Sequence, residues 1–277
     1  MSLVYAVILG IVEGLTEFLP VSSTGHLTIV EKLMGMNIDD PGVTAFTAII
    51  QVGAIVAVVV YFWRDIVRLV AAWARGLAHP QDRDQDYRTA WFIIIGSVPI
   101  GVVGLAARHV ISGPLRNLWV VVAGLVVWSG FMWLAERTAT RIGKAQRGEE
   151  KLNLGDAVVI GLMQCLALVP GVSRSGATIS AGLFRGLNRV AATRVSFLMS
   201  IPALVAAGAF EAATGYHDVA AGPGWVATGL AMLVSLVVAY AVIAWLLRFV
   251  QHHRISAFNW YRITVAALVA VYLLTVG

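Results

Sequence analysis

The chain has 277 residues, of which 59% are hydrophobic and only 13% are charged, and its mean hydropathy is +0.82. This composition excludes a water-soluble domain. The formal net charge of +5 raises the question of nucleic-acid binding, but no basic stripe is interleaved with base-stacking aromatic residues, so we expect no nucleic-acid partner. The composition predicts a polytopic protein whose solvent is the lipid bilayer.

Apolar stretches long enough to cross about 30 Å of hydrocarbon recur along the chain. They lie at about 42–62, 89–107, 118–135, 195–213, 225–247 and 257–277. We therefore expect an all-α integral membrane protein with six transmembrane helices. Tryptophans near the ends of several spans are typical of an interfacial aromatic belt, whereas Trp128 lies mid-span and is expected to pack inside the protein.

Two shorter segments do not fit a simple span. Residues 2–36 are predicted to form a helix, a break at 20–25 and a second short helix, and residues 155–187 repeat that pattern around 170–176. Neither half-helix is long enough to cross, so both segments are predicted to be re-entrant helical hairpins. Irregular backbone at membrane depth is tolerated only where protein or water surrounds it, so the two tips are expected to meet in the interior.

The distribution of basic residues predicts the orientation. Fifteen of the twenty basic residues fall in four loops: between the first and second spans, after the third, before the fourth and after the fifth. If these loops are cytoplasmic, the positive-inside rule is satisfied by one topology, in which both termini lie outside. The loops near 37–41, 108–117 and 214–224 then face outward, and interfacial residues such as Lys32 and Glu211 lie on that side.

An internal repeat accompanies the hairpins. A shift of 151 residues superposes identical residues at several places, including Ser22 on Ser173, Gly25 on Gly176 and Gly35 on Gly186. Each half would hold one hairpin and three spans, and an odd number of crossings inserts the second half upside down, which predicts an inverted-topology repeat. We expect a single membrane domain, 1–277, with repeat one at about 1–135, a cytoplasmic link at about 136–154 and repeat two at about 155–277.

An acidic pair precedes the first tip. Glu13 and Glu17 are spaced i, i+4, which places both carboxylates on one face of a helix. Like charges so close repel, and either a divalent cation between them or a proton held by one of them would relieve the repulsion. Mg²⁺ or Ca²⁺ is the natural candidate, because both take carboxylate and phosphate oxygens. A pair that faces an aqueous vestibule without a metal is the alternative.

The residues after the helix-breaking proline of the first tip are small and polar: Ser22, Ser23, Thr24, Gly25 and His26. Their amides and hydroxyls can surround an anion, and a helix expected to begin near His26 would point its positive end at that anion. His26 is a candidate general base or nucleophile, and Ser23 is the competing nucleophile. The first tip is therefore predicted to cradle a phosphate.

The second tip supplies a positively charged side chain. Arg174 is permanently charged, and its planar guanidinium suits two phosphate oxygens at once. Its neighbours add hydroxyl donors and close backbone approach: Ser173, Ser175, Gly176 and Thr178. An arginine that extends to the membrane interface is the alternative, but the predicted hairpin holds Arg174 at a buried tip.

The stretches Glu13-x-x-x-Glu17-Phe-Leu-Pro-Val-Ser-Ser-Thr-Gly-His26 and Pro170-Gly-Val-Ser-Arg-Ser-Gly-Ala-Thr178 closely resemble the bacterial undecaprenyl-diphosphate phosphatase family, the bacitracin-resistance type. The resemblance extends over nearly the whole chain. It implies a hydrolase of the bacterial inner membrane that acts on a polyprenyl diphosphate lipid, releases inorganic phosphate and returns undecaprenyl phosphate to peptidoglycan synthesis. By position, it implies that the acidic pair, the Ser/His elements and the arginine loop are the functional residues.

The mechanism expected from these parts begins with substrate arriving from the outer leaflet. A divalent ion on Glu13 and Glu17, together with Arg174, would neutralise the phosphate oxygens. The terminal phosphorus would then be attacked in line by Ser23, by His26, or by a water that His26 deprotonates. The sequence leaves these three nucleophiles open.

Two other functions fit parts of the pattern. A phosphatidic-acid phosphatase has comparable Ser-Gly-His and Ser-Arg blocks, but that type requires a histidine six residues after the arginine, where this chain has Ser180. A transporter or flippase would suit inverted repeats with broken helices. Transporters rarely concentrate an acidic pair, a Ser/Thr-Gly-His loop and an arginine at one phosphate-sized site, so hydrolysis is the favoured prediction.

Overall fold

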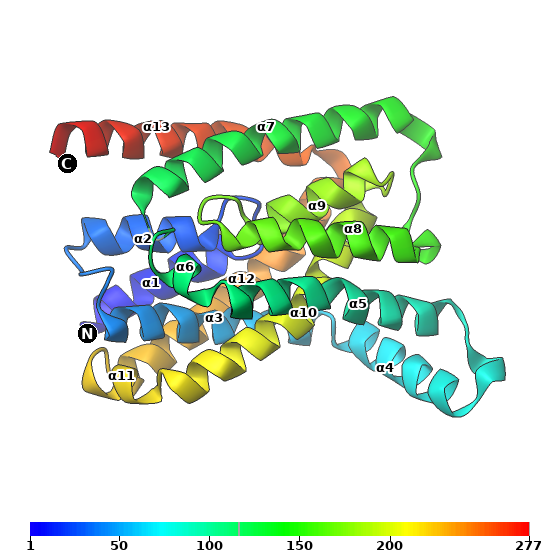
Figure 1. Ribbon diagram of the computed structural model, residues 1–277, viewed down its shortest axis with the longest axis horizontal. Helices are drawn as coiled ribbons and strands as arrows, with labels where there is room; N and C mark the ends of the chain where they lie inside the picture. The colour runs from blue at the N-terminus through cyan, green and yellow to red at the C-terminus, as the bar shows by residue number, and fades with distance from the viewer. Residues whose placement is uncertain (116, 277) are drawn as a thin grey trace.

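The computed structural model describes residues 1–115 and 117–276, and every regular element within them is a helix (Figure 1). Six of these helices are long and apolar enough to cross a membrane, which confirms the predicted all-α membrane protein. They are α3 (Pro41–Tyr61), α5 (Gln85–Ala106), α7 (Leu118–Ile142), α10 (Arg189–Thr214), α12 (Trp225–His252) and α13 (Phe258–Val276). Trp128 is buried, as predicted.

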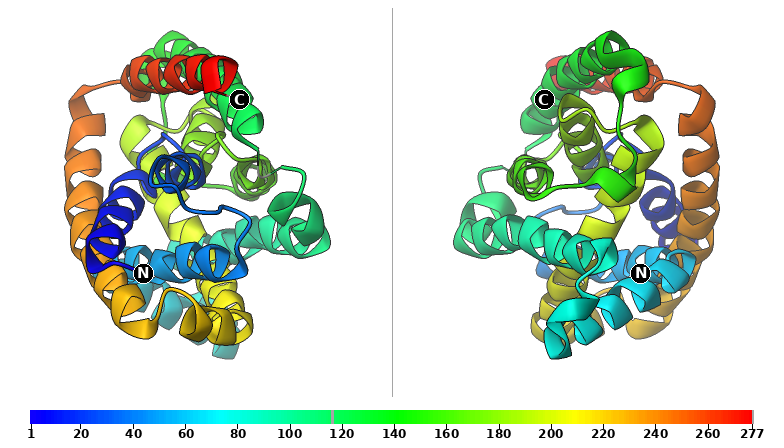
Figure 2. Two further views of the ribbon diagram at one scale, coloured as in Figure 1. Left: turned by 90° about the vertical axis from the view of Figure 1, so that its left-hand side faces the viewer. Right: turned by 90° about the vertical axis from the view of Figure 1, so that its right-hand side faces the viewer.

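Two pairs of shorter helices occupy the places of the predicted hairpins. They are α1 (Leu3–Thr16) with α2 (Ser23–Leu33), and α8 (Leu154–Cys165) with α9 (Arg174–Phe184). The loops that join each pair approach each other in the middle of the molecule, and the longer helices surround α2 in the end-on view (Figures 1 and 2). Insertion of the two halves in opposite senses remains a prediction.

The backbone at the ends of α2 resembles that at the ends of α9. Each helix begins after a serine with positive φ, 78° at Ser22 and 76° at Ser173, and each serine side chain accepts the amide three residues on. Each helix is followed by a left-handed glycine, Gly35 or Gly186. A positive φ costs a non-glycine residue about 1–3 kcal/mol and persists only where the surrounding structure enforces it. The contacts between the tips described below provide that constraint.

The segment between the first two spans differs from the expected loop. It contains an amphipathic helix, α4 (Trp63–Ala78), which packs against α5 through Leu69 and Ala72. Its arginines, Arg64, Arg68 and Arg75, are exposed, as in helices that rest at a membrane interface. Three of the five basic residues of this segment therefore belong to α4, and a fourth, Arg88, belongs to α5.

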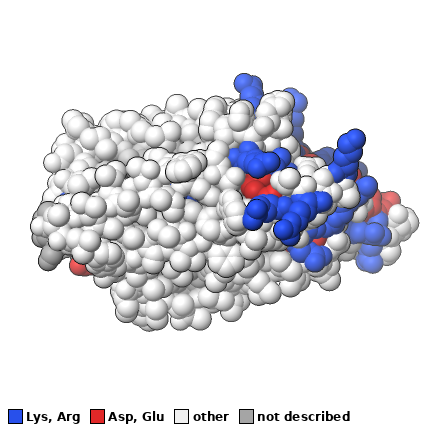
Figure 3. Space-filling view, turned by 90° about the horizontal axis from the view of Figure 1, so that it is seen from above, with Lys and Arg blue, Asp and Glu red and all other residues white. Residues whose placement is uncertain are grey.

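Charged side chains gather at one end of the molecule (Figure 3). At this end Asp156 accepts hydrogen bonds from Arg147 and Arg185, and Glu136 pairs with Arg189. Both termini lie at the opposite end (Figure 1). The ends of the molecule thus differ in charge as the sequence predicts.

Candidate active site

The two tips are joined by direct hydrogen bonds. Ser22 Oγ accepts the amide of Gly171 at 3.1 Å, and Ser175 Oγ donates to the carbonyl of Leu19 at 2.9 Å. Ser173 Oγ donates to the same carbonyl at 3.4 Å. The prediction that the tips meet in the interior is therefore confirmed.

The carboxylate of Glu17 lies at the centre of this junction. Its Oε1 accepts from Nη2 of Arg174 at 2.9 Å, and its Oε2 accepts from Oγ of Ser23 at 2.5 Å. The Glu17 side chain is 4% exposed and that of Arg174 is 11% exposed, so the ion pair is shielded from solvent. A hydrogen bond this short is typical of a hydroxyl donating to an ionised carboxylate. The carboxylate of Glu17 therefore links the guanidinium of Arg174 to the hydroxyl of Ser23.

Glu13 lies one helical turn earlier, because the amide of Glu17 donates to the carbonyl of Glu13 at 3.0 Å. Its side chain is buried, and Oε1 has no hydrogen-bond partner among the described residues. A buried carboxylate oxygen without a partner requires a proton or a cation. No cluster of three or more His, Cys, Asp or Glu side chains occurs within the described ranges, so a cation here would complete its shell with phosphate and water oxygens. Such a mixed shell fits Mg²⁺ and Ca²⁺.

His26 is placed differently from the expectation. Helix α2 begins at Ser23, so His26 lies within its first turns and not at its start. Its Nδ1 lies 2.7 Å from the carbonyl oxygen of Ser22 and its Nε2 lies 2.8 Å from the hydroxyl of Tyr261. Because a carbonyl only accepts, Nδ1 carries the proton, and Tyr261 donates to Nε2. The lone pair of His26 is therefore directed at Tyr261 and not at Ser23.

The other predicted phosphate ligands are mostly engaged within the protein. The hydroxyls of Ser22, Ser173 and Ser175 make the bonds between the tips, and that of Thr178 bonds to α9 backbone and to α10. Thr24 is exposed. The amides of Gly25 and Gly176 donate to the helix-capping serines. Phosphate binding by these residues stays a prediction.

Both short helices direct their N-termini at this junction, α2 from Ser23 and α9 from Arg174. The N-terminus of a helix carries a partial positive charge and free amides, which favour a bound anion. With the guanidinium of Arg174, the junction therefore offers three sources of positive potential around one hydroxyl and two carboxylates.

Sequence reasoning missed Arg262, which lies in α13 and is completely buried. It donates to the carbonyl of Pro20 at 2.8 Å, to that of Gly171 at 2.9 Å and to Ser129 Oγ at 3.1 Å. Its further acceptors are the carbonyl oxygens of Gly124, Leu125 and Val172. This arginine of α13 thus acts as a clamp that bonds to both tips. A lone arginine inside an apolar span is the signal that could have revealed it.

Residues 6–268 match the protein family described as bacitracin resistance protein BacA. The chain belongs to this family. An undecaprenyl-diphosphatase of Cutibacterium acnes (strain DSM 16379 / KPA171202) is 56% identical over 277 residues, covering 97% of this chain and 96% of the relative. One of Acidothermus cellulolyticus (strain ATCC 43068 / DSM 8971 / 11B) is 56% identical over 278 residues, covering 99% and 98%. One of Mycobacterium sp. (strain KMS) is 47% identical over 279 residues, again covering 99% and 98%.

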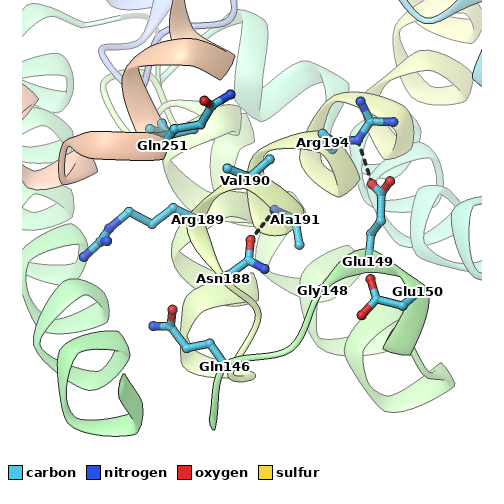
Figure 4. Close-up of a pocket in the computed structure, with 11 residues that line it drawn as sticks. Gln146, Gly148, Glu149, Glu150, Asn188, Arg189, Val190, Ala191, Arg194 and Gln251 are labelled. Atoms are coloured by element: carbon cyan, nitrogen blue, oxygen red, sulfur yellow. Dashed lines mark hydrogen bonds and ion pairs between the residues drawn. The ribbon is translucent and has the colours of Figure 1, made fainter. Parts of the chain in front are cut away.

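A cavity of this bacitracin resistance family member, about 460 Å³ in volume, lies at the charged end (Figure 4). Its two arginines are neutralised by carboxylates: Arg194 bonds to Glu149 at 2.8 Å, and Arg189 pairs with Glu136 at 2.7 Å. Asn188 caps α10 there. These ion pairs join α10 to α7 and to the segment around Glu149.

Proposed function

We propose that this protein hydrolyses undecaprenyl diphosphate to undecaprenyl phosphate and inorganic phosphate, and so recycles the lipid carrier of peptidoglycan synthesis and confers bacitracin resistance. The observation that carries the proposal is the chain of contacts from Arg174 through Glu17 to Ser23. The names of the relatives, which match over nearly their whole length, support the substrate. Purified protein in detergent micelles is expected to release phosphate from undecaprenyl diphosphate. A pure transporter would release none, because it breaks no bond of the diphosphate.

In the proposed reaction, Arg174 binds oxygens of the terminal phosphate and Ser23 Oγ attacks its phosphorus in line. The Ser23 proton passes to Glu17 Oε2, and the bond to the bridging oxygen breaks as undecaprenyl phosphate leaves. Glu17 gives this proton to the departing undecaprenyl phosphate and is ionised again. Water then attacks the phosphoserine: Glu17 takes a proton from that water and returns it to Ser23 Oγ as the bond from Oγ to phosphorus breaks and inorganic phosphate leaves. His26 holds the first turn of α2 in place through its bond to the Ser22 carbonyl.

Substitution of Ser23 by alanine is expected to lower kcat for phosphate release by about 10³-fold or more, because the nucleophile is lost. Ser256→Ala, at the charged end of the molecule, is the matched control and should keep nearly full activity. A chiral terminal phosphorus should leave the wild-type reaction with retained configuration, as two successive inversions require. Inversion, together with substantial turnover of Ser23→Ala, would instead assign the attack to water.

We propose further that Glu13 and Glu17 hold one divalent cation, Mg²⁺ or Ca²⁺, which when bound supplies positive charge to the phosphate oxygens. A chelator is expected to stop phosphate release, and either ion to restore it. Glu13→Gln should raise the ion concentration needed for half-maximal activity about tenfold or more. Full activity of the wild type in excess chelator would exclude the cation.

We also propose that the protein lies in the bacterial inner membrane with both termini and the active site open to the outer face. The charged end opposite the termini supports this orientation. A cysteine introduced for Asn37 should react with a membrane-impermeant reagent from the outside of intact cells, whereas one introduced for Gln146 should not. The reverse pattern would show that the protein is inserted the other way.

A further inference from the structure

The ring of His26 is held at both of its nitrogens. The residue is 7% exposed; its Nδ1 donates to the carbonyl of Ser22 at 2.7 Å, and its Nε2 accepts from the hydroxyl of Tyr261 at 2.8 Å. The two rings also stack, with centroids 5.5 Å apart and an angle of 8° between their planes. An imidazole bonded in this way has one tautomer and one ring orientation.

The hydroxyl of Tyr261 is directed into the protein although the residue is 48% exposed. Tyr261 belongs to α13, one of the six helices suited to span a membrane. Tyrosines in such helices are concentrated at the membrane surface, where the hydroxyl meets water. Here the hydroxyl instead bonds to a histidine that lies 235 residues earlier in the chain. An interfacial belt therefore does not account for the direction of this side chain.

The carbonyl that accepts from His26 belongs to the same peptide unit as the amide of Ser23. Ser22 has a φ of 78°, which is costly for a residue with a side chain, and its carbonyl also accepts the amide of His26 at 3.2 Å. Because a peptide unit is planar and rigid, the direction of this carbonyl limits where the Ser23 side chain can lie. In the structure Oγ of Ser23 lies 2.5 Å from Oε2 of Glu17. The bond from His26 therefore holds the backbone from which the proposed nucleophile projects.

Two adjacent residues of α13 hold two points of the first tip. Arg262 donates to the carbonyl of Pro20 at 2.8 Å, and Tyr261 reaches the carbonyl of Ser22 through the ring of His26. Successive side chains of a helix project about 100° apart, so the two residues contact different parts of the tip. The backbone that leads into α2 is thus fixed from α13 at both carbonyls.

We propose that Tyr261 is a positioning residue, which acts through His26 to hold Ser23 Oγ in line with the terminal phosphorus. The proposal rests on the proposed function, in which Ser23 is the nucleophile. Without the Tyr261 hydroxyl the imidazole is held at Nδ1 alone, so its ring can tilt and the Ser22 carbonyl can turn with it. Misplacement of the attacking oxygen slows the chemical step, whereas substrate binding depends on Arg174 and is unaffected.

The test begins with Tyr261→Phe, which removes the hydroxyl and keeps the ring and its stacking. This variant is expected to lower kcat for phosphate release about tenfold or more and to leave KM within about twofold of the wild-type value. Tyr240→Phe, at a 44% exposed position of α12, is the matched control and should keep the wild-type kcat.

Both kinetic constants are then measured with the same substitution in a His26→Asn protein. Asparagine places an amide donor where Nδ1 lies in histidine, but has no atom that meets the Tyr261 hydroxyl. The His26→Asn protein should therefore be active, and Tyr261→Phe should have no further effect on its kcat. Such non-additivity is specific to two residues that act as a unit.

A fall in kcat of equal size in both backgrounds would show that Tyr261→Phe acts on the packing of α13 and not through His26, and would overturn the proposal. An unchanged kcat would also overturn it, whether or not KM rises. An inactive His26→Asn protein would do the same, because the imidazole would then do more than hold the Ser22 carbonyl. Absence of phosphate release by the wild type would instead overturn the proposed function, so the two failures are distinguishable.

Discussion

Replacement of Glu17 by glutamine is expected to lower kcat for phosphate release by about 10³-fold, within the range that a lost general base produces. Glutamine keeps the shape of the side chain but cannot take the Ser23 proton, and it no longer neutralises Arg174. Phosphate release from purified protein in micelles measures the effect. A melting temperature within a few degrees of wild type would show that the loss is chemical.

Glu211→Gln is the matched control for this experiment. Glu211 is a half-buried carboxylate in α10 that takes no part in the junction, so its amide variant should retain nearly full activity. Turnover of Glu17→Gln within tenfold of wild type would remove Glu17 from the reaction. It would leave the Ser23 proton to another acceptor.

Replacement of Arg262 by methionine is expected to destabilise the protein and to abolish activity together. Methionine fills much of the volume but leaves the buried carbonyls of Pro20 and Gly171 without their donor. An unsatisfied buried polar group costs about 1–3 kcal/mol, so the free energy of unfolding should fall by about 3 kcal/mol. Thermal denaturation in detergent and phosphate release measure the two effects.

Arg262→Lys should be intermediate, because an ammonium group can reach only some of the acceptors that the guanidinium serves. Arg248→Met, at an exposed position of α12, is the control and should match the wild type in both measurements. An Arg262→Met protein that melts like the wild type and remains active would show that the tips hold together without this clamp.

Hydropathy predicted the spans. The energetic cost of polar groups in hydrocarbon predicted that the tips meet, because such groups face the interior of a membrane protein. The contact between Glu17 and Arg174, 157 residues apart, follows from that reasoning. The same reasoning did not identify Arg262, because most of its partners are backbone carbonyls, which every residue has and which no sequence pattern marks. A search for charged pairs therefore finds only one of the two buried arginines that define the junction.

The polar residues of the tips show a second limit of prediction from the sequence. Serine and threonine suit a phosphate cradle, but the same hydroxyls also cap helices and satisfy loop carbonyls. In the structure Ser22 and Ser173 cap α2 and α9. Ser22 also accepts the amide of Gly171 and Ser173 donates to the carbonyl of Leu19, whereas Ser23 donates to the carboxylate of Glu17. The predicted start of α2 was wrong for the same reason, because Ser22 caps the helix and α2 begins at Ser23. His26 therefore lies inside the helix, where it bonds to Tyr261.

The bonds between the tips also bear on how the protein is made. Ser22 and Gly171 are 149 residues apart, and Leu19 and Ser175 are 156 apart. A ribosome that has produced the first hairpin must synthesise three spans and a linker before the partner groups exist. During that interval the polar groups of the first tip depend on water, on lipid head groups or on the insertion machinery for their hydrogen bonds. Contacts this distant in sequence close late, so the junction of the tips forms only after more than half of the chain has been made.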